Sequence, residues 1–227
     1  MKDIIENNLP KILIASLLII IGVIGRLTLF ELLPKSPSIY LNLNGITQPL
    51  FMMDLFFIIA IIAILSGLLL NSYYAFFIPL SVMAITDLII GNNFIFIFTW
   101  SGFAMIGVIF YLIKSKNKFT IKNTPFLFGA SIGTILLYDL WTNFGSFLGV
   151  YPKTLTGLTL CYTVAIPFTL WHMLSTTIAF GLIVLPILYI KEKELIKIDY
   201  SVKPIEKQVT LSLLVVTMIL SVVFVLV

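Results

Sequence analysis

The chain has 227 residues, of which 60% are hydrophobic and 11% are charged, and its formal net charge is +4. Soluble domains carry about 25% charged residues, so this composition excludes a soluble enzyme and a nucleic-acid-binding protein. Cys161 is the single cysteine of the sequence, so no intrachain disulfide and no cysteine metal cage can form. We expect neither a metal centre nor a cofactor.

Seven apolar segments are long enough, or nearly so, to cross a membrane as helices. A helix needs about 20 mostly apolar residues to span the roughly 30 Å hydrocarbon layer. The segments are 11–33, 51–70, 74–91, 94–113, 125–148, 167–190 and 208–227. Pro79 interrupts the third, so the third and fourth could instead form one long kinked hairpin with the same two crossings. The runs lack the period-two alternation of membrane strands.

These segments predict an all-α integral membrane protein with three parts. Residues 1–190 form a six-helix transmembrane bundle, 191–207 a basic cytoplasmic linker, and 208–227 one additional C-terminal transmembrane helix. The first apolar segment is too long for a cleaved signal peptide and no small-x-small cleavage site follows it. We therefore expect this segment to stay in the membrane as an anchor.

The lysines predict the orientation in the membrane. If the N-terminus is inside, eleven lysines lie in the inner segments and two, Lys35 and Lys153, lie in the outer ones. Cytoplasmic loops carry an excess of Lys and Arg. We expect a multi-pass protein of the cell (plasma) membrane with a cytoplasmic N-terminus, and an outer C-terminus if the last helix crosses completely.

The two longest outer segments, 34–50 and 149–166, are not charged linkers. They contain prolines, tyrosines, asparagines and threonines among apolar residues. Two interpretations stay open: the segments fold back over the bundle as lids, or their Tyr and Pro residues anchor them at the membrane interface.

Polar and indole side chains gather in the outer halves of the predicted helices, whereas the inner halves are almost purely apolar. Ionisable residues inside a membrane usually mark function or pairing. A pore or a proton relay would need polar residues along the whole crossing, so this pattern favours a cup that opens outward and binds a ligand. The six residues that we predict to bind it, called the polar layer below, are Arg26, Asp87, Trp100, Asp139, Asn143 and His172.

Each residue of the polar layer also has a structural interpretation. Arg26 could pair with Asp87 or with Asp139 and fix helix packing. Asn143 could form an interhelical hydrogen bond, His172 could be a packed hydrogen-bonding residue, and Trp100 could anchor at the interface. Asp139 and Asn143 are four residues apart and share a helix face, so both can contact one ligand.

Gly129 and Gly133 form a small-xxx-small pattern on the fifth predicted helix. Such surfaces allow close helix packing in membranes. We expect Gly129 and Gly133 to contact another helix, either within the bundle or on a partner.

The sequence contains no G-x-x-x-x-G-K-[ST], no H-E-x-x-H and no G-x-S-x-G motif. The chain itself therefore does not hydrolyse ATP through a P-loop, and we expect it not to be an enzyme. A minor alternative is an intramembrane enzyme, for which Asp139 with His172 is the one candidate catalytic pair.

A group of short motifs covers the fifth helix and the segment after it. They are Thr142-Asn143-Phe144-Gly145, Tyr151-Pro152-Lys153-Thr154, Gly157-Leu158, Cys161-Tyr162 and Ala165-Ile166-Pro167-Phe168. Together they resemble the signature of a prokaryotic membrane family of unassigned function, which in turn resembles the substrate-binding S components of energy-coupling-factor (ECF) transporters. The resemblance covers about residues 15–190.

This resemblance implies a six-helix bundle that captures a small vitamin-like or metal-like solute near its outer face. It also implies an ECF coupling subunit and ATPase subunits on other chains. Helix 208–227 and the lack of a clear Ala-x-x-x-Ala pair in the first helix depart from that pattern.

Two hypotheses about function follow. The first is the substrate-capture component of an uptake transporter for a small vitamin-like or cationic solute. In the outer halves Asp54, Asp87 and Asp139 stand against Arg26 alone, which suggests a cationic or zwitterionic solute. The alternative is a non-catalytic accessory subunit of a larger membrane complex, in which the polar layer only holds helices together.

Overall fold

The computed structural model describes most of the chain, in stretches separated by short gaps. The described residues are 2–31, 39–43, 45–50, 56–70, 72–91, 94–116, 120–193 and the single positions 208, 212, 215, 216, 219 and 223. The six single positions of segment 208–227 are helical and exposed, and the other residues of that segment lie outside the described part. Most of the predicted linker 191–207 also lies outside the described part.

The described chain is almost entirely helical, which confirms the predicted all-α class apart from one short hairpin. The elements are α1 (Lys2–Phe30), β1 (Ile39–Leu43), β2 (Ile46–Leu50), α2 (Phe56–Leu69), α3 (Ser72–Ile90), α4 (Phe96–Ser115), the 3₁₀ turn η1 (Ile121–Asn123), α5 (Thr124–Val150), α6 (Leu155–Ala179), the π-helical turn η2 (Phe180–Val184) and α7 (Leu185–Glu192). The elements α6, η2 and α7 follow one another without a break. Pro79 lies inside α3, which remains a helix separate from α4.

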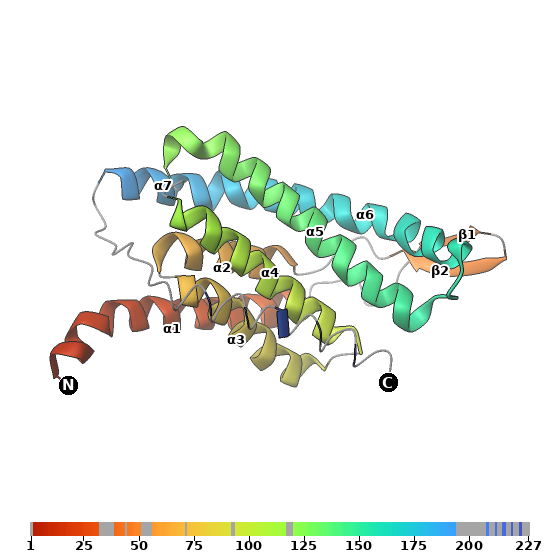
Figure 1. Ribbon diagram of the computed structural model, residues 1–227, viewed down its shortest axis with the longest axis horizontal. Helices are drawn as coiled ribbons and strands as arrows, with labels where there is room; N and C mark the ends of the chain where they lie inside the picture. The colour runs from red at the N-terminus through yellow and green to blue at the C-terminus, as the bar shows by residue number, and fades with distance from the viewer. Residues whose placement is uncertain are drawn as a thin grey trace.

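The helices run along the long axis of the molecule, and α5 lies beside α6 (Figure 1). Contacts join α1 to α3, α3 to α4, and α4 to α5. Helix α2 touches α1, α3, α4 and α6. Its sequence is apolar on every side, which is typical of a helix surrounded by protein, and Ala63 and Leu68 are fully buried.

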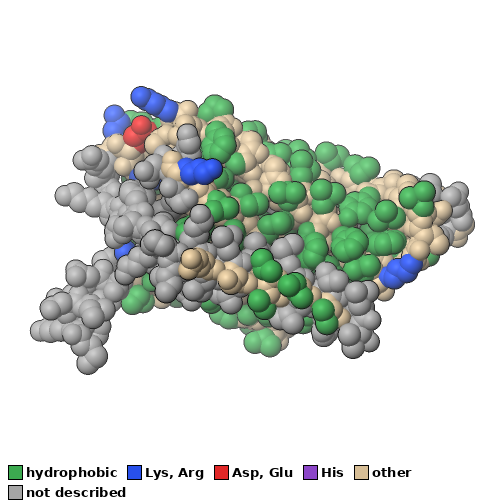
Figure 2. Space-filling model, viewed as in Figure 1, with side chains coloured by type: hydrophobic (Ala, Val, Ile, Leu, Met, Phe, Trp, Pro, Cys, Tyr) green, Lys and Arg blue, Asp and Glu red, His purple; other side chains and the backbone are tan. Residues whose placement is uncertain are grey.

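Three helices of the described chain are long and apolar enough to cross a membrane. They comprise Lys11–Leu29, Phe96–Ile113 and Leu155–Glu192, and shorter apolar helices cover Ile58–Leu69 and Tyr74–Ile90. Hydrophobic side chains cover much of the visible side of the molecule, and the visible Lys and Arg side chains lie toward its two ends (Figure 2). These features are consistent with the predicted membrane protein.

The prediction of an outer loop over residues 149–166 is wrong, because α6 begins at Leu155 and not at residue 167. Thr154 is extended, with φ −125 and ψ 164, and its side chain accepts a hydrogen bond from the Gly157 N–H. This N-cap satisfies a backbone donor that the first turn would otherwise leave free. The helix then continues through Pro167.

The other predicted outer loop, 34–50, contains the antiparallel hairpin β1–β2. Gly45 lies in its turn with φ 79, a conformation that glycine adopts without steric cost. Strand β2 contacts α6 (Figure 1). The hairpin therefore lies against the bundle, as a lid would, whereas residues 34–38 and 44 are outside the described part.

Candidate functional site

A buried carboxylate–imidazole pair joins α5 to α6. Asp139 Oδ1 lies 2.7 Å from His172 Nδ1, and the two side chains are 5% and 0% exposed. An ionised carboxylate can only accept hydrogen bonds, so Nδ1 carries the proton when Asp139 is charged. Phe168 and Tyr138 flank the imidazole, with ring centroids 4.4 Å and 6.3 Å away. The ring is thus fixed by packing as well as by its hydrogen bond.

The second carboxylate oxygen of Asp139 is not satisfied. Asp139 Oδ2 is buried and has no hydrogen-bond partner among the residues that the structure describes. Buried polar atoms are nearly always paired, and an unpaired one is costly. Such an atom indicates strain, or a place where a water molecule or a ligand atom binds.

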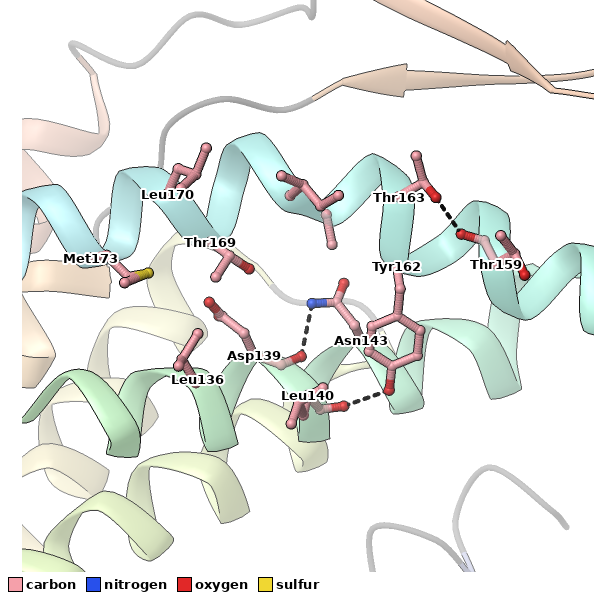
Figure 3. Close-up of a pocket in the computed structure, with 12 residues that line it drawn as sticks. Leu136, Asp139, Leu140, Asn143, Thr159, Tyr162, Thr163, Thr169, Leu170 and Met173 are labelled. Carbon is pink, nitrogen blue, oxygen red and sulfur yellow. Dashed lines mark hydrogen bonds between the residues drawn. The ribbon is translucent and has the colours of Figure 1, made fainter. Parts of the chain in front are cut away.

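A cavity of about 540 Å³ lies between α5 and α6 at this carboxylate. Its volume is within the range of small-molecule sites. The labelled side chains of the two helices border the space between them (Figure 3). The lining residues are Leu136, Asp139, Leu140, Asn143, Thr159, Tyr162, Thr163, Ala165, Ile166, Thr169, Leu170 and Met173.

Several polar side chains of this α5–α6 cavity already donate to the protein backbone. Asn143 Nδ2 donates to the Asp139 carbonyl at 2.8 Å. The Tyr162 hydroxyl donates to the Leu140 carbonyl at 2.9 Å, and Thr163 Oγ1 donates to the Thr159 carbonyl at 2.7 Å (Figure 3). These bonds hold the lining side chains in place and leave their oxygen lone pairs available.

A second buried cluster ties α1, α3 and α4 together. Arg26 Nη1 donates to Asp87 Oδ1 at 2.6 Å and also to Thr86 Oγ1. Trp100 Nε1 donates to Asp87 Oδ2 at 2.6 Å. Both oxygens of Asp87 therefore accept a hydrogen bond. We call Arg26, Thr86, Asp87 and Trp100 the α1–α3–α4 cluster.

The structure distributes the polar layer over these two places. Asp139 and Asn143 line the α5–α6 cavity, and His172 is bonded to Asp139. Arg26, Asp87 and Trp100 are not among the lining residues and form the α1–α3–α4 cluster instead. Of the two pairings considered for Arg26, the structure contains the one with Asp87. A role of these six residues in ligand binding stays a prediction.

Sequence reasoning missed the α6 side of the cavity. Thr159, Tyr162, Thr163, Thr169 and Met173 recur at helical spacing and line one wall. That signal was present in the sequence, but Thr159, Tyr162 and Thr163 were hidden because residues 149–166, with Pro152 and Gly157, were interpreted as an outer loop. Recognising Thr154 as an N-cap would have revealed the wall.

The predicted glycine pattern does not make its expected contact within the described chain. A Cβ built on Gly129 or on Gly133 meets no atom within 4 Å. A Cβ on Gly107, by contrast, would overlap the Ala75 carbonyl oxygen. Gly107 is therefore the glycine that lets α3 and α4 approach closely, and contact of Gly129 and Gly133 with a partner stays a prediction.

Among the described residues there is no group of three or more His, Cys, Asp or Glu side chains that could hold a metal ion.

Residues 6–198 match the model of DUF6580, which is described as a family of unknown function. The chain belongs to this family. No curated protein and no solved structure matches the chain.

Proposed function

We propose that this chain is an integral membrane protein that captures a small solute in the α5–α6 cavity. The observation that carries the proposal is the buried Asp139 oxygen, which has no protein partner among the described residues and belongs to a lining residue. A side chain that served only to hold helices together would be expected to use both oxygens, as Asp87 does.

The proposed topology follows the lysine distribution and the helix lengths. A six-helix bundle crosses the membrane with its N-terminus in the cytoplasm, and segment 208–227 adds a crossing. Asp139 then lies eleven residues, or about 16 Å along the helix, before the outer end of α5 at Val150. In this topology the cavity lies in the outer half of the membrane, on the side from which a solute would arrive.

The proposed physiological role is uptake. The chain resembles S components of ECF transporters, and it lacks a P-loop. Release of the solute on the inner side would therefore require an ECF-type coupling subunit and ATPase subunits on other chains. In this role the chain binds and delivers the solute and catalyses no reaction.

The test is solute retention by the purified protein. We expect native mass spectrometry after mild detergent extraction to detect a small molecule bound to the wild-type chain. The Asp139→Ala plus Asn143→Ala variant should lose it. Ser146→Ala is the matched control, because Ser146 is on α5, bonds to its own helix at Thr142 and does not line the cavity.

Equal retention by the wild type and the double variant would contradict capture in the α5–α6 cavity. Helical circular dichroism must be the same for all three proteins, so that loss of solute is not loss of fold.

A second function, the accessory subunit of a membrane complex, is favoured by one observation. Gly129 and Gly133 leave an open surface on α5, on which another membrane helix could pack closely. Stoichiometric co-purification with a membrane enzyme that is not an ATPase, with no solute retained, would favour this function over uptake.

A further inference from the structure

We infer that the solute held in the α5–α6 cavity is an organic ammonium ion with an apolar body, whose nitrogen donates to Asp139 Oδ2. This inference deepens the proposed function and rests on it. Three features of the cavity support it: its hydrogen-bonding capacity, its charge and its apolar walls.

Several polar groups of the cavity have acceptors left after their donors are used. Asn143 Nδ2, the Tyr162 hydroxyl and the Thr163 hydroxyl each donate to a backbone carbonyl. A hydroxyl has one donor and two acceptor lone pairs, so Tyr162 and Thr163 have acceptors left and no donor. Asp139 Oδ2 adds an acceptor that no described residue uses. Asn143 keeps one N–H, and the Thr159 and Thr169 hydroxyls also line the cavity, so donors lie beside these acceptors. Asp139 Oδ2 is the buried acceptor that still needs a donor, and an alkylammonium group brings three.

The charge of the cavity points to a cation. Asp139 is a lining residue, and none of the lining residues is Lys or Arg. Arg26 is bonded to Asp87 in the α1–α3–α4 cluster. When the imidazole of His172 is neutral, the Asp139–His172 pair has a charge of −1. Burying a charge is unfavourable unless an opposite charge pairs with it, so in that protonation state a ligand cation is favoured over a neutral or anionic ligand.

The walls around this carboxylate are apolar. Leu136, Leu140, Ile166, Leu170 and Met173 line the same cavity, and Leu140, Ile166 and Leu170 are exposed on the described surface. Figure 3 shows Leu136 and Met173 near Asp139, and Leu170 on the side of α6 that is turned away from Asp139. A ligand with a hydrocarbon body beside its ammonium group would bury that body against these side chains. Each added methylene that contacts them should increase affinity about fourfold.

The experiment compares three probes that share one body. They are cyclohexylmethylammonium, cyclohexylmethanol and cyclohexanecarboxylate, titrated calorimetrically into the full chain in detergent at neutral pH. We expect the ammonium to bind at least tenfold more tightly than the alcohol and the carboxylate. Asp139→Asn should abolish this preference, and Asp139→Glu, which keeps the charge, should keep part of it. Ser146→Ala should bind like the wild type.

Three results would overturn the inference: tighter or equal binding of the alcohol or carboxylate, no binding of any probe, or an unchanged preference in Asp139→Asn. If Asp139→Asn does not fold, the order of the three probes on the wild-type chain decides alone. The proposed function is judged separately, by retention of the native solute. Retained solute with no preference for the ammonium would leave capture standing and overturn only the ligand class.

Discussion

In the α1–α3–α4 cluster both carboxylate oxygens of Asp87 accept a hydrogen bond, whereas only one oxygen of Asp139 does so between α5 and α6. Both aspartates are on apolar helices and both are buried. Asp87 is bonded to an arginine and to an indole, which together use both of its carboxylate oxygens. Asp139 is bonded to a histidine and lines a cavity. The comparison teaches that burial of a charge alone does not distinguish the two aspartates, whereas unused hydrogen-bonding capacity beside a cavity does, and our proposed binding site rests on that difference.

The largest loss of stability is expected for Asp87→Ala. This change removes the acceptor of both Arg26 and Trp100, and leaves a guanidinium that is only 18% exposed without its partner. Removing one partner of a buried pair costs about 3–5 kcal/mol of stability. We expect the lower part of that range and a clearly lower unfolding temperature in detergent.

The double variant Arg26→Met plus Asp87→Leu is the control for this prediction. It removes both charges together, so the part of the loss that comes from the unpaired guanidinium should return, whereas Trp100 Nε1 still lacks its acceptor. If Asp87→Ala unfolds at the wild-type temperature, the α1–α3–α4 cluster does not stabilise the bundle.

A smaller loss of stability is expected for Asp139→Ala in solute-free protein. The change removes the acceptor of His172 Nδ1, and a buried donor left unpaired costs about 1–3 kcal/mol. It also removes the unsatisfied Oδ2, which offsets part of that cost. Thermal unfolding without ligand should therefore show a smaller shift than Asp87→Ala. A larger shift would show that the pair with His172 is the main structural support, and the contrast between the two aspartates would be wrong.

A loss of about 1 kcal/mol is expected for Thr154→Ala. The change removes the side chain that accepts from the Gly157 N–H at 3.1 Å, and N-cap losses are typically of this size. Hydrogen exchange should increase in the first turns of α6, which include the cavity-lining Thr159, and should not change around Trp100 in α4. Thr154→Ser keeps the cap and serves as the control. Uniform exchange across both regions would show that the start of α6 does not unfold separately from the rest.

The helices could be predicted from the sequence where long apolar runs define them. The fifth segment was expected at 125–148 and α5 is Thr124–Val150. The start of α6 could not be recognised from composition, since Pro152, Gly157 and Pro167 are typical turn residues and the local N-cap at Thr154 outweighs them. Seven segments were expected to cross a membrane, and three helices of the described chain are long and apolar enough to do so.

The sequence could predict which polar residues belong to the site, but it could not predict which of them bond to one another. The sequence placed six polar or indole groups in the outer halves of the helices, and two of them line the cavity. The partner of Arg26 was open between Asp87 and Asp139, because the choice depends on which helix packs against α1. Helix α3 does so, and Asp87 is therefore the partner.

The smallest effect on the isolated chain is expected for Gly129→Ala plus Gly133→Ala. The space around both glycines is open, so the added methyl groups overlap nothing described, and alanine favours a helix slightly more than glycine does. We expect an unfolding temperature equal to or slightly above that of the wild type. Gly107→Ala is the matched control, because its Cβ would overlap the Ala75 carbonyl and should cost about 1–3 kcal/mol. If a partner helix packs on this side of α5, the double alanine variant should lose that partner during purification while remaining folded. A variant that keeps every co-purifying protein would show that this surface of α5 does not hold a partner helix.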